Sequence, residues 1–195
     1  MKLKIYRIFF TILIILALIV TIQIGIKYSR NYQYEKENEK VVEVFSREIG
    51  TLEEDVEMNG YKVIGIVKIP KIEIEYPILD IDTYNPEETK EPMKFSIVKY
   101  WGGNVNDYGN LSIAGHNNYD GTMFGKTKKL VKGDIVELTD LSKKTIQYEI
   151  YDIFVTDPND VMILQTKDEN IREVTLITCT NGNKQRLILK AREVM

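Results

Sequence analysis

The chain has 195 residues with 26 basic and 29 acidic side chains, so its formal net charge is −3. This acidic balance, without a basic block, argues against nucleic acid as a partner, because nucleic-acid binding needs clustered cations that neutralise phosphates. The single cysteine excludes an intrachain disulfide, so a folded part must be stabilised by its own hydrophobic core.

The first predicted element is a membrane anchor at residues 8–26, which are almost all apolar. About 20 such residues in a helix cross a hydrocarbon core of ~30 Å. Three cations precede the run: Lys2, Lys4 and Arg7. They favour a cytoplasmic tail at residues 1–7 and a single-pass membrane protein whose helix contacts lipid and whose remaining residues face outward. The alternative is a cleaved signal peptide, but the flank 23–28 lacks the small-residue cleavage site that such a peptide needs.

Residues 27–60 are charged, and we expect them to form a helical stalk next to the membrane. Apolar residues recur there at helical spacing: Val41, Phe45, Ile49, Leu52 and Val56. Gly50 interrupts this stripe, and Thr51-Leu-Glu-Glu54 has the form of a capping box. The pattern therefore predicts one helix that ends near Gly50 and a second that begins at Thr51. For residues 27–40, a solvated linker is the open alternative.

Residues 61–195 have the pattern of a β domain. Apolar segments separated by Pro, Gly and Asn breakers predict strands at 63–69, 72–79, 111–114, 135–138, 145–155, 174–179 and 187–189. Residues 80–110 are rich in breakers and predict loops, with one short apolar island at 95–98. Thr122 can cap one short helix from Met123 to about Leu130. About seven or eight short strands with one or two short helices predict a mostly β fold, a closed or nearly closed barrel. The segment is long enough for one domain with a core.

No metal or cofactor site is predicted. The acidic cluster of Asp80, Asp82, Glu87 and Glu88 lacks the spacing of a known calcium loop. One cysteine and one histidine are too few soft ligands for a structural zinc site.

Three residues at strand ends have the chemistry of a thiol acyl-transfer site. Cys179 ends an apolar, threonine-rich segment, and after the turn 181–183 Arg186 opens the next apolar run. The Asn-Gly pair in this turn predicts a hairpin of two strands joined by a tight loop. His116, the only histidine, ends another apolar segment far upstream. A thiol, an imidazole and a guanidinium are the groups that such a site requires. For each residue alone, the open alternatives are an inert buried cysteine, a solvent-exposed histidine and a surface arginine.

Four segments resemble the sortase family. They are Thr175-Leu-Ile-Thr-Cys179 with Arg186-Leu-Ile-Leu189, then Gly109-Asn-Leu-Ser-Ile-Ala-Gly-His116-Asn117, Gly65-Ile-Val-Lys-Ile-Pro-Lys-Ile72, and Lys132-Gly-Asp134. The likeness agrees in order, in spacing and in the N-terminal anchor, and it covers nearly everything after Tyr61.

The resemblance implies an eight-stranded sortase-type barrel in residues 61–195, outside the cell, with the activity of a cysteine transpeptidase. Such an enzyme cleaves a Leu-Pro-x-Thr-Gly-like sorting signal of a surface protein between Thr and Gly through a thioacyl-enzyme. It then passes the acyl group to an amine of a peptidoglycan precursor or of a pilin at a Gram-positive cell wall. No cofactor is implied.

The resemblance also implies residue roles. Cys179 is the nucleophile, His116 stabilises its thiolate and exchanges protons with the leaving and incoming amines, and Arg186 holds the oxyanion or the substrate backbone. Four further residues are expected to bind the signal: Thr178, Asn117, Val161 and Ile163. The last two belong to the loop 158–172, which we expect to form a wall of the binding groove.

The subclass and two other functions stay open. The connection 157–173 is shorter than in the iron-uptake branch of the family, although Gly121-Thr-Met-Phe124 resembles that branch. A class D-like or unclassified small sortase fits better. The other functions are a thiol hydrolase that uses water as acceptor, and a catalytically silent, membrane-tethered binding module.

Overall fold

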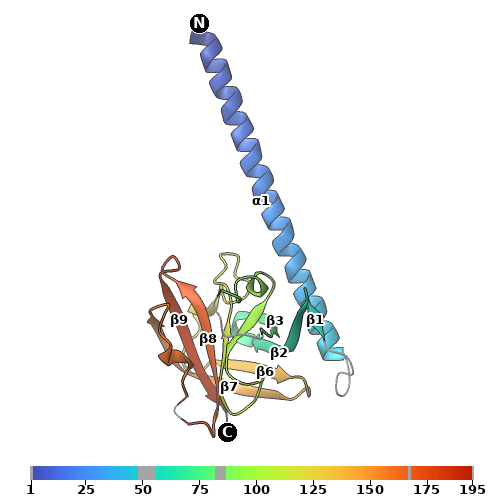
Figure 1. The fold of residues 1–195 in the computed structure, drawn as a ribbon, viewed down its shortest axis with the longest axis vertical. Helices are drawn as coiled ribbons and strands as arrows, with labels where there is room; N and C mark the ends of the chain where they lie inside the picture. Colours follow the sequence, from blue (N-terminus) through green and yellow to red (C-terminus); the bar gives the residue numbers. More distant parts are fainter. Residues whose placement is uncertain (1, 48–55, 82–86, 167, 195) are drawn as a thin grey trace. The chain divides into compact units, whose positions relative to one another are not determined.

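The computed structural model describes residues 2–47, 56–81, 87–166 and 168–194. The chain divides into two compact units, Met1–Glu37 and Asn38–Met195. The first unit consists of the greater part of helix α1 (Lys2–Arg47; Figure 1). From Tyr6 onward, α1 has the length and apolar composition that a membrane-crossing helix needs.

The last turns of α1 belong to the second unit and pack on its β domain. Val41 and Phe45, two members of the predicted apolar stripe, are buried there. The side-chain amide of Asn38 donates a hydrogen bond of 2.9 Å to the carbonyl of Phe95. Helix α1 is continuous from the predicted anchor into the predicted stalk. The start of the second helix predicted from Thr51 lies outside the described residues, and further along the predicted stalk Glu57–Met58 form a short strand instead of a helix.

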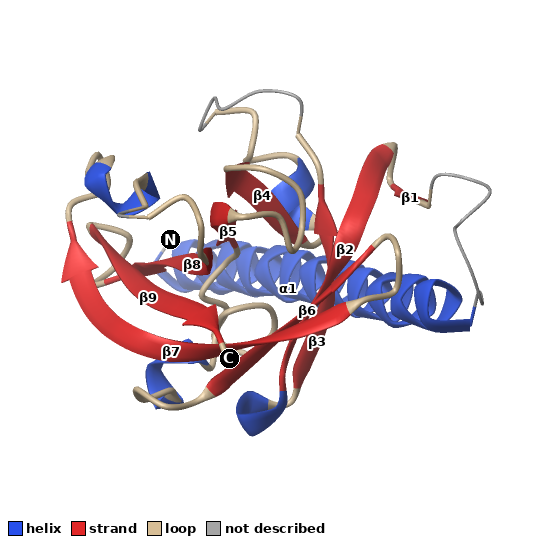
Figure 2. Cartoon of the chain, turned by 90° about the horizontal axis from the view of Figure 1, so that it is seen from below, coloured by secondary structure: helices blue, strands red, loops and turns tan. Residues whose placement is uncertain are grey.

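Eight strands form the β domain. They are β2 (Tyr61–Ile69), β3 (Ile74–Leu79), β4 (Ile97–Trp101), β5 (Gly109–Ala114), β6 (Ile135–Asp140), β7 (Thr145–Thr156), β8 (Arg172–Thr180) and β9 (Gln185–Glu193). Their order is β2-β3-β4-β5-β8-β9-β7-β6, and β6 pairs with β2 to close the sheet (Figure 2). A two-residue strand, β1 (Glu57–Met58), adds to β2. The predicted closed barrel of eight strands is confirmed.

Two pairs in the barrel are parallel, β3 with β4 and β5 with β8, and the other pairs are antiparallel. A parallel pair requires a long crossover between its strands. The crossover from β5 to β8 contains β6 and β7, which return to the barrel on its other side. Strands β5 and β8, which are far apart in the sequence, therefore run side by side and end at the same rim of the barrel.

The short helical elements of the barrel are 3₁₀ turns. They are η1 (Pro70–Ile72), η2 (Pro92–Lys94), η3 (Thr127–Lys129) and η4 (Met162–Leu164). The helix predicted from Met123 to Leu130 is thus only the single turn η3. Met123 itself has a φ of 47°, in the left-handed region, which a right-handed helix cannot contain.

The apolar residues form two clusters, one on each face of the sheet. Residues from all eight strands fill the barrel interior, among them Leu111 of β5 and Leu176 of β8. A second cluster lies on the outer face and includes Ala114 of β5 and Ile177 of β8, together with Phe45 of α1. Both faces of β5 and β8 are therefore covered, which explains their nearly continuous apolar sequences.

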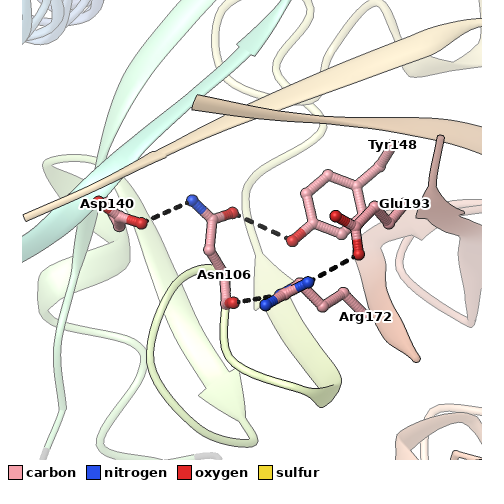
Figure 3. A network of polar contacts seen from close by, with 5 residues as sticks. All are labelled: Asn106, Asp140, Tyr148, Arg172 and Glu193. Carbon is pink, nitrogen blue, oxygen red and sulfur yellow. Dashed lines mark hydrogen bonds and ion pairs between the residues drawn. The ribbon is translucent and has the colours of Figure 1, made fainter. Parts of the chain in front are cut away.

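A polar network around the buried residues Asn106 and Tyr148 joins the loop before β5 to the start of β8 (Figure 3). The side chain of Asn106 donates to Asp140 at 2.9 Å and accepts from the Tyr148 hydroxyl at 3.0 Å. Its main-chain carbonyl accepts from Arg172 Nε at 2.7 Å, and Arg172 forms an ion pair of 2.8 Å with Glu193. Asparagine suits this position because its φ is 67°. The network fixes the first residue of β8 against the last residue of β9.

Candidate active site

The parallel pairing of β5 with β8 brings His116 and Cys179 to one rim of the barrel. Ala114 of β5 lies opposite Ile177 of β8, so the residues that follow them emerge together. Two hydrogen bonds continue the pairing: Gly115 N donates to Ile177 O at 3.1 Å, and Thr178 Oγ1 donates to Gly115 O at 2.8 Å.

Arg186 lies directly opposite Cys179 in the antiparallel pair of β8 and β9. Opposed residues on adjacent strands have Cβ atoms about 4.5–5.5 Å apart, so the thiol and the guanidinium share one face of the sheet. The hairpin between them uses left-handed residues at Asn181, Gly182 and Asn183. One guanidinium nitrogen, Nη1, donates to the carbonyls of Asn183 and Gln185, at 3.2 and 3.3 Å.

These three residues line a pocket of about 560 Å³ on the outer face of the sheet. Its floor comes from β4, β5 and β8: Tyr100, Ala114, Gly115, His116, Ile177, Thr178 and Cys179. One wall is the segment 158–164 without Met162, and the other comes from Glu87, Thr89, Lys90 and Met93. Arg186 of β9 completes the lining. The predicted residues Thr178, Val161 and Ile163 all belong to it.

Asn117 is placed differently from the other predicted residues. It is not among the residues that line the pocket. Its side-chain amide instead donates to the main-chain carbonyl of Cys179 at 2.8 Å. The main chain on either side of it is held as well, because Phe124 N donates to His116 O at 3.0 Å and Asn117 forms a β-bridge with Met123. Asn117 thus contacts the backbone of the cysteine from beside the histidine.

Sequence reasoning missed part of the pocket, namely Tyr100 and the wall from Glu87 to Met93. Tyr100 follows Val98 at the two-residue period of a strand, so alternation along β4 could have assigned both to one face. The wall from Glu87 to Met93 has no such signal, because it lies in a loop-rich segment whose position depends on distant contacts.

The environment of the site favours the neutral form of His116. Desolvation lowers the pKa of this imidazole below its usual value of 6.5, because partial burial disfavours the charged form. Solvent still reaches His116, and the free thiol of Cys179 is half-buried. A neutral imidazole near an accessible thiol can act as its base, and the opposed guanidinium can bind a developing oxyanion. No cluster of three or more potential metal ligands occurs among the described residues.

Comparison with known proteins identifies the family that shares this arrangement. A sequence model of the sortase domain matches residues 67–194. Sortase A of Staphylococcus aureus is 22% identical over 192 residues, which cover 93% of this chain and 90% of that protein. Sortase A of Bacillus anthracis is 26% identical over 161 residues, which cover 80% and 72%. The solved structure of a Clostridium perfringens sortase D5 transpeptidase is similar with a TM-score of 0.62 and 29% identity, covering 83% of this chain and 98% of that one.

Proposed function

Because this chain belongs to the sortase family and is a cysteine transpeptidase, we propose that it cleaves a Leu-Pro-x-Thr-Gly-like sorting signal between Thr and Gly. The acyl group then passes to an amine of a peptidoglycan precursor or of a pilin. The observation that carries this proposal is that Cys179, His116 and Arg186 line one and the same pocket. Sortases act on sorting signals of surface proteins. We therefore expect an extended peptide segment of such a signal to bind in this pocket.

The first half of the reaction forms a thioester on Cys179. Neutral His116 takes the thiol proton, and the thiolate attacks the threonine carbonyl to give a tetrahedral oxyanion. The imidazolium then donates that proton to the glycine nitrogen, and the amide bond breaks. The lowered pKa of His116 supports this assignment, because an imidazolium that is disfavoured by its surroundings is a stronger acid.

The second half transfers the acyl group. The acceptor amine attacks the thioester, neutral His116 takes a proton from its nitrogen, and the new amide forms as the Cys179 thiolate leaves. The imidazolium then returns its proton to the thiolate, which restores the starting pair. Arg186 has a fixed charge opposite the nucleophile, so its guanidinium stabilises the oxyanion or holds the substrate carbonyl in both halves.

The remaining predicted residues take different roles in this proposal. Val161 and Ile163 provide an apolar wall for the signal, and Thr178 contributes to the floor next to the nucleophile. Asn117 is better assigned to positioning Cys179, because its amide is bonded to the cysteine carbonyl and it does not line the pocket.

We also propose that the chain is a single-pass membrane protein. Residues 1–7 would be cytoplasmic, residues 8–26 would span the membrane, residues 27–60 would form the stalk, and residues 61–195 would be the catalytic domain outside the cell. The apolar helix supports the anchor, and the flanking cations support the orientation. The similarity to a sortase D5 supports a class D-like assignment.

Peptide acylation of the full-length chain in detergent tests the catalytic proposal. A panel of labelled Leu-Pro-x-Thr-Gly-like peptides is added, and mass spectrometry follows the intact protein. We expect an adduct on Cys179 that ends at the threonine and that an added amine discharges. Cys179→Ala should form no adduct while keeping the fold, because the change from thiol to methyl is small. Discharge to water alone in the presence of many amines would indicate a thiol hydrolase. A wild-type thiol that reacts with neither peptide nor iodoacetamide would indicate a silent binding module.

A further inference from the structure

One wall of the active-site pocket is a segment without strand pairing. Residues 157–166, here called the wall segment, form the first part of the connection from β7 to β8 and contain η4. Within it, Asn159 N donates to Asp157 Oδ1 and Met162 N to Asp160 Oδ1, both at 2.9 Å. These local bonds determine the shape of the turns. They do not determine where the wall segment lies on the barrel.

A buried side chain of β5 supplies a contact that does fix its position. Asn110 Nδ2 donates to the carbonyl of Leu164 at 3.0 Å and lies 3.4 Å from that of Ile163. The other end of the amide is occupied as well, because Asn110 Oδ1 accepts from Thr175 Oγ1 of β8 at 2.8 Å. The carboxamide therefore joins three parts of the structure: β5, β8 and the wall segment.

The identity of residue 110 agrees with a specific polar role. Asparagine is disfavoured in strands, and Asn110 is buried in the middle of the sheet between β4 and β8. A buried amide is tolerated where its donors and acceptor are paired, and here they are. The two carbonyls that it reaches would otherwise lose a protein partner next to an apolar pocket.

We propose that Asn110 is a positioning residue for binding of the sorting signal. Its amide fixes η4 against β5, so that Ile163 and Leu164 form the pocket wall. Asn110 is not among the residues that line the pocket, and it acts through the two that are. This inference rests on the proposed function, because it assigns to that pocket the task of binding the peptide.

Two variants separate this role from a general role in stability. Asn110→Asp keeps the size and the acceptor for Thr175, but it replaces the donor with an oxygen that faces two carbonyls. Asn110→Ala removes both the donor to the wall segment and the acceptor for Thr175. Lys190→Met is the matched control, because exposed Lys190 Nζ also donates to the wall segment, at Gln165 O and 3.2 Å, but from solvent.

The experiment uses the full-length chain in detergent and the peptide that acylates Cys179 best. Both Asn110 variants should raise KM for the peptide about tenfold, with kcat within about twofold of wild type. The rate of Cys179 alkylation by iodoacetamide should not change, since this small reagent does not need the wall. Lys190→Met should match wild type in all three measurements.

Hydrogen exchange gives a readout that does not depend on turnover. The amides of Leu164 and Gln165, which close η4, should exchange about tenfold faster in both Asn110 variants and at the wild-type rate in Lys190→Met. Failure of the wild-type chain to form any acyl adduct would contradict the proposed function, and the exchange rates would still test the position of the wall.

Three results would overturn the role of Asn110. Unchanged exchange in η4 would show that the wall does not depend on the amide. A fall in kcat at constant KM would place the effect on the chemistry instead of on binding. Loss of the native fold in both variants would make Asn110 a residue of barrel stability.

Discussion

The side-chain amide of Asn117 donates a hydrogen bond of 2.8 Å to the main-chain carbonyl of Cys179. Because Asn117 follows His116 directly, this bond links the backbone of the proposed base to the backbone of the proposed nucleophile. Thr178 makes a second link in the opposite direction, from its hydroxyl to Gly115 O at 2.8 Å. The separation of imidazole and thiol is therefore held by hydrogen bonds between two chain segments, in addition to the pairing of β5 with β8.

Asn117→Ala should lower kcat about tenfold with little change in KM, because the loss of one positioning hydrogen bond affects the chemistry more than peptide binding. Steady-state kinetics with the acylating peptide measures both constants. Asn118→Ala is the matched control, since the Asn118 amide donates to Thr122 Oγ1 in the same turn, at 2.9 Å. A rise in KM at constant kcat in Asn117→Ala would instead support direct contact with the signal.

Arg186→Lys should reduce the rate of acylation by about 10²-fold or more. The ammonium of lysine is a compact point charge that cannot reproduce the planar set of donors, and removal of one oxyanion donor costs about 10²–10³ in rate. Single-turnover acylation of Cys179, followed by mass spectrometry, measures the effect. Exposed Lys184 in the same hairpin is the control, and Lys184→Met should retain the wild-type rate. Retention of most activity in Arg186→Lys would rule out the role assigned to the guanidinium.

The titration of His116 should be visible directly, because the chain has one histidine. Nuclear magnetic resonance of the imidazole of the folded chain should give a pKa below 6.5, since desolvation disfavours the charged form. An observed pKa above 6.5 would mean that an anionic neighbour, such as the thiolate, outweighs the desolvation.

The same shift predicts how stability depends on pH. Below pH 6.5 the unfolded chain binds a proton at His116 more readily than the folded chain does. The contribution of neutral His116 to the free energy of unfolding is therefore fully present above pH 6.5. It decreases as the pH falls toward the pKa of His116 in the folded chain, and it is absent below that pKa. Thermal unfolding of wild type and His116→Gln between about pH 5 and 7.5 isolates this contribution, and only wild type should lose it. Parallel curves for the two proteins would contradict the shift.

Asn106→Ala should destabilise the barrel without affecting the thiol. It removes the partly buried bond to Asp140 and the buried bond to Tyr148, and it places alanine at a φ of 67°. The combined loss should be about 3 kcal/mol, or a Tm lower by roughly 6–12 °C. Asn183→Ala is the control for backbone strain, because Asn183 has a φ of 70° in an exposed turn. Equal losses in the two variants would mean that the network in Figure 3 contributes nothing beyond the strain. Alkylation of Cys179 by iodoacetamide should proceed at the wild-type rate.

Much of the fold could be predicted because the relevant signals are local. Apolar segments separated by Pro, Gly and Asn predicted most of the strands. The Asn-Gly turn predicted a hairpin, and in the structure this hairpin places Arg186 opposite Cys179. The helix predicted at Met123 failed for a local reason as well, since a left-handed residue interrupts it. Periodicity alone did not indicate that β5 and β8 are parallel neighbours. The motifs of the resemblance supplied that relation.

The sequence by itself determined the apolar helix, the β domain and the three groups that can carry out thiol acyl transfer. Only the tertiary structure decided which polar residues hold those groups and the pocket wall. Asn117 contacts a carbonyl 62 positions away and Asn110 one 54 positions away. The physical reason is that the presence of an asparagine in the sequence does not show whether its side-chain amide contacts a peptide, solvent or a distant main-chain carbonyl. Its partner is set by the closure of the barrel, which no local pattern encodes.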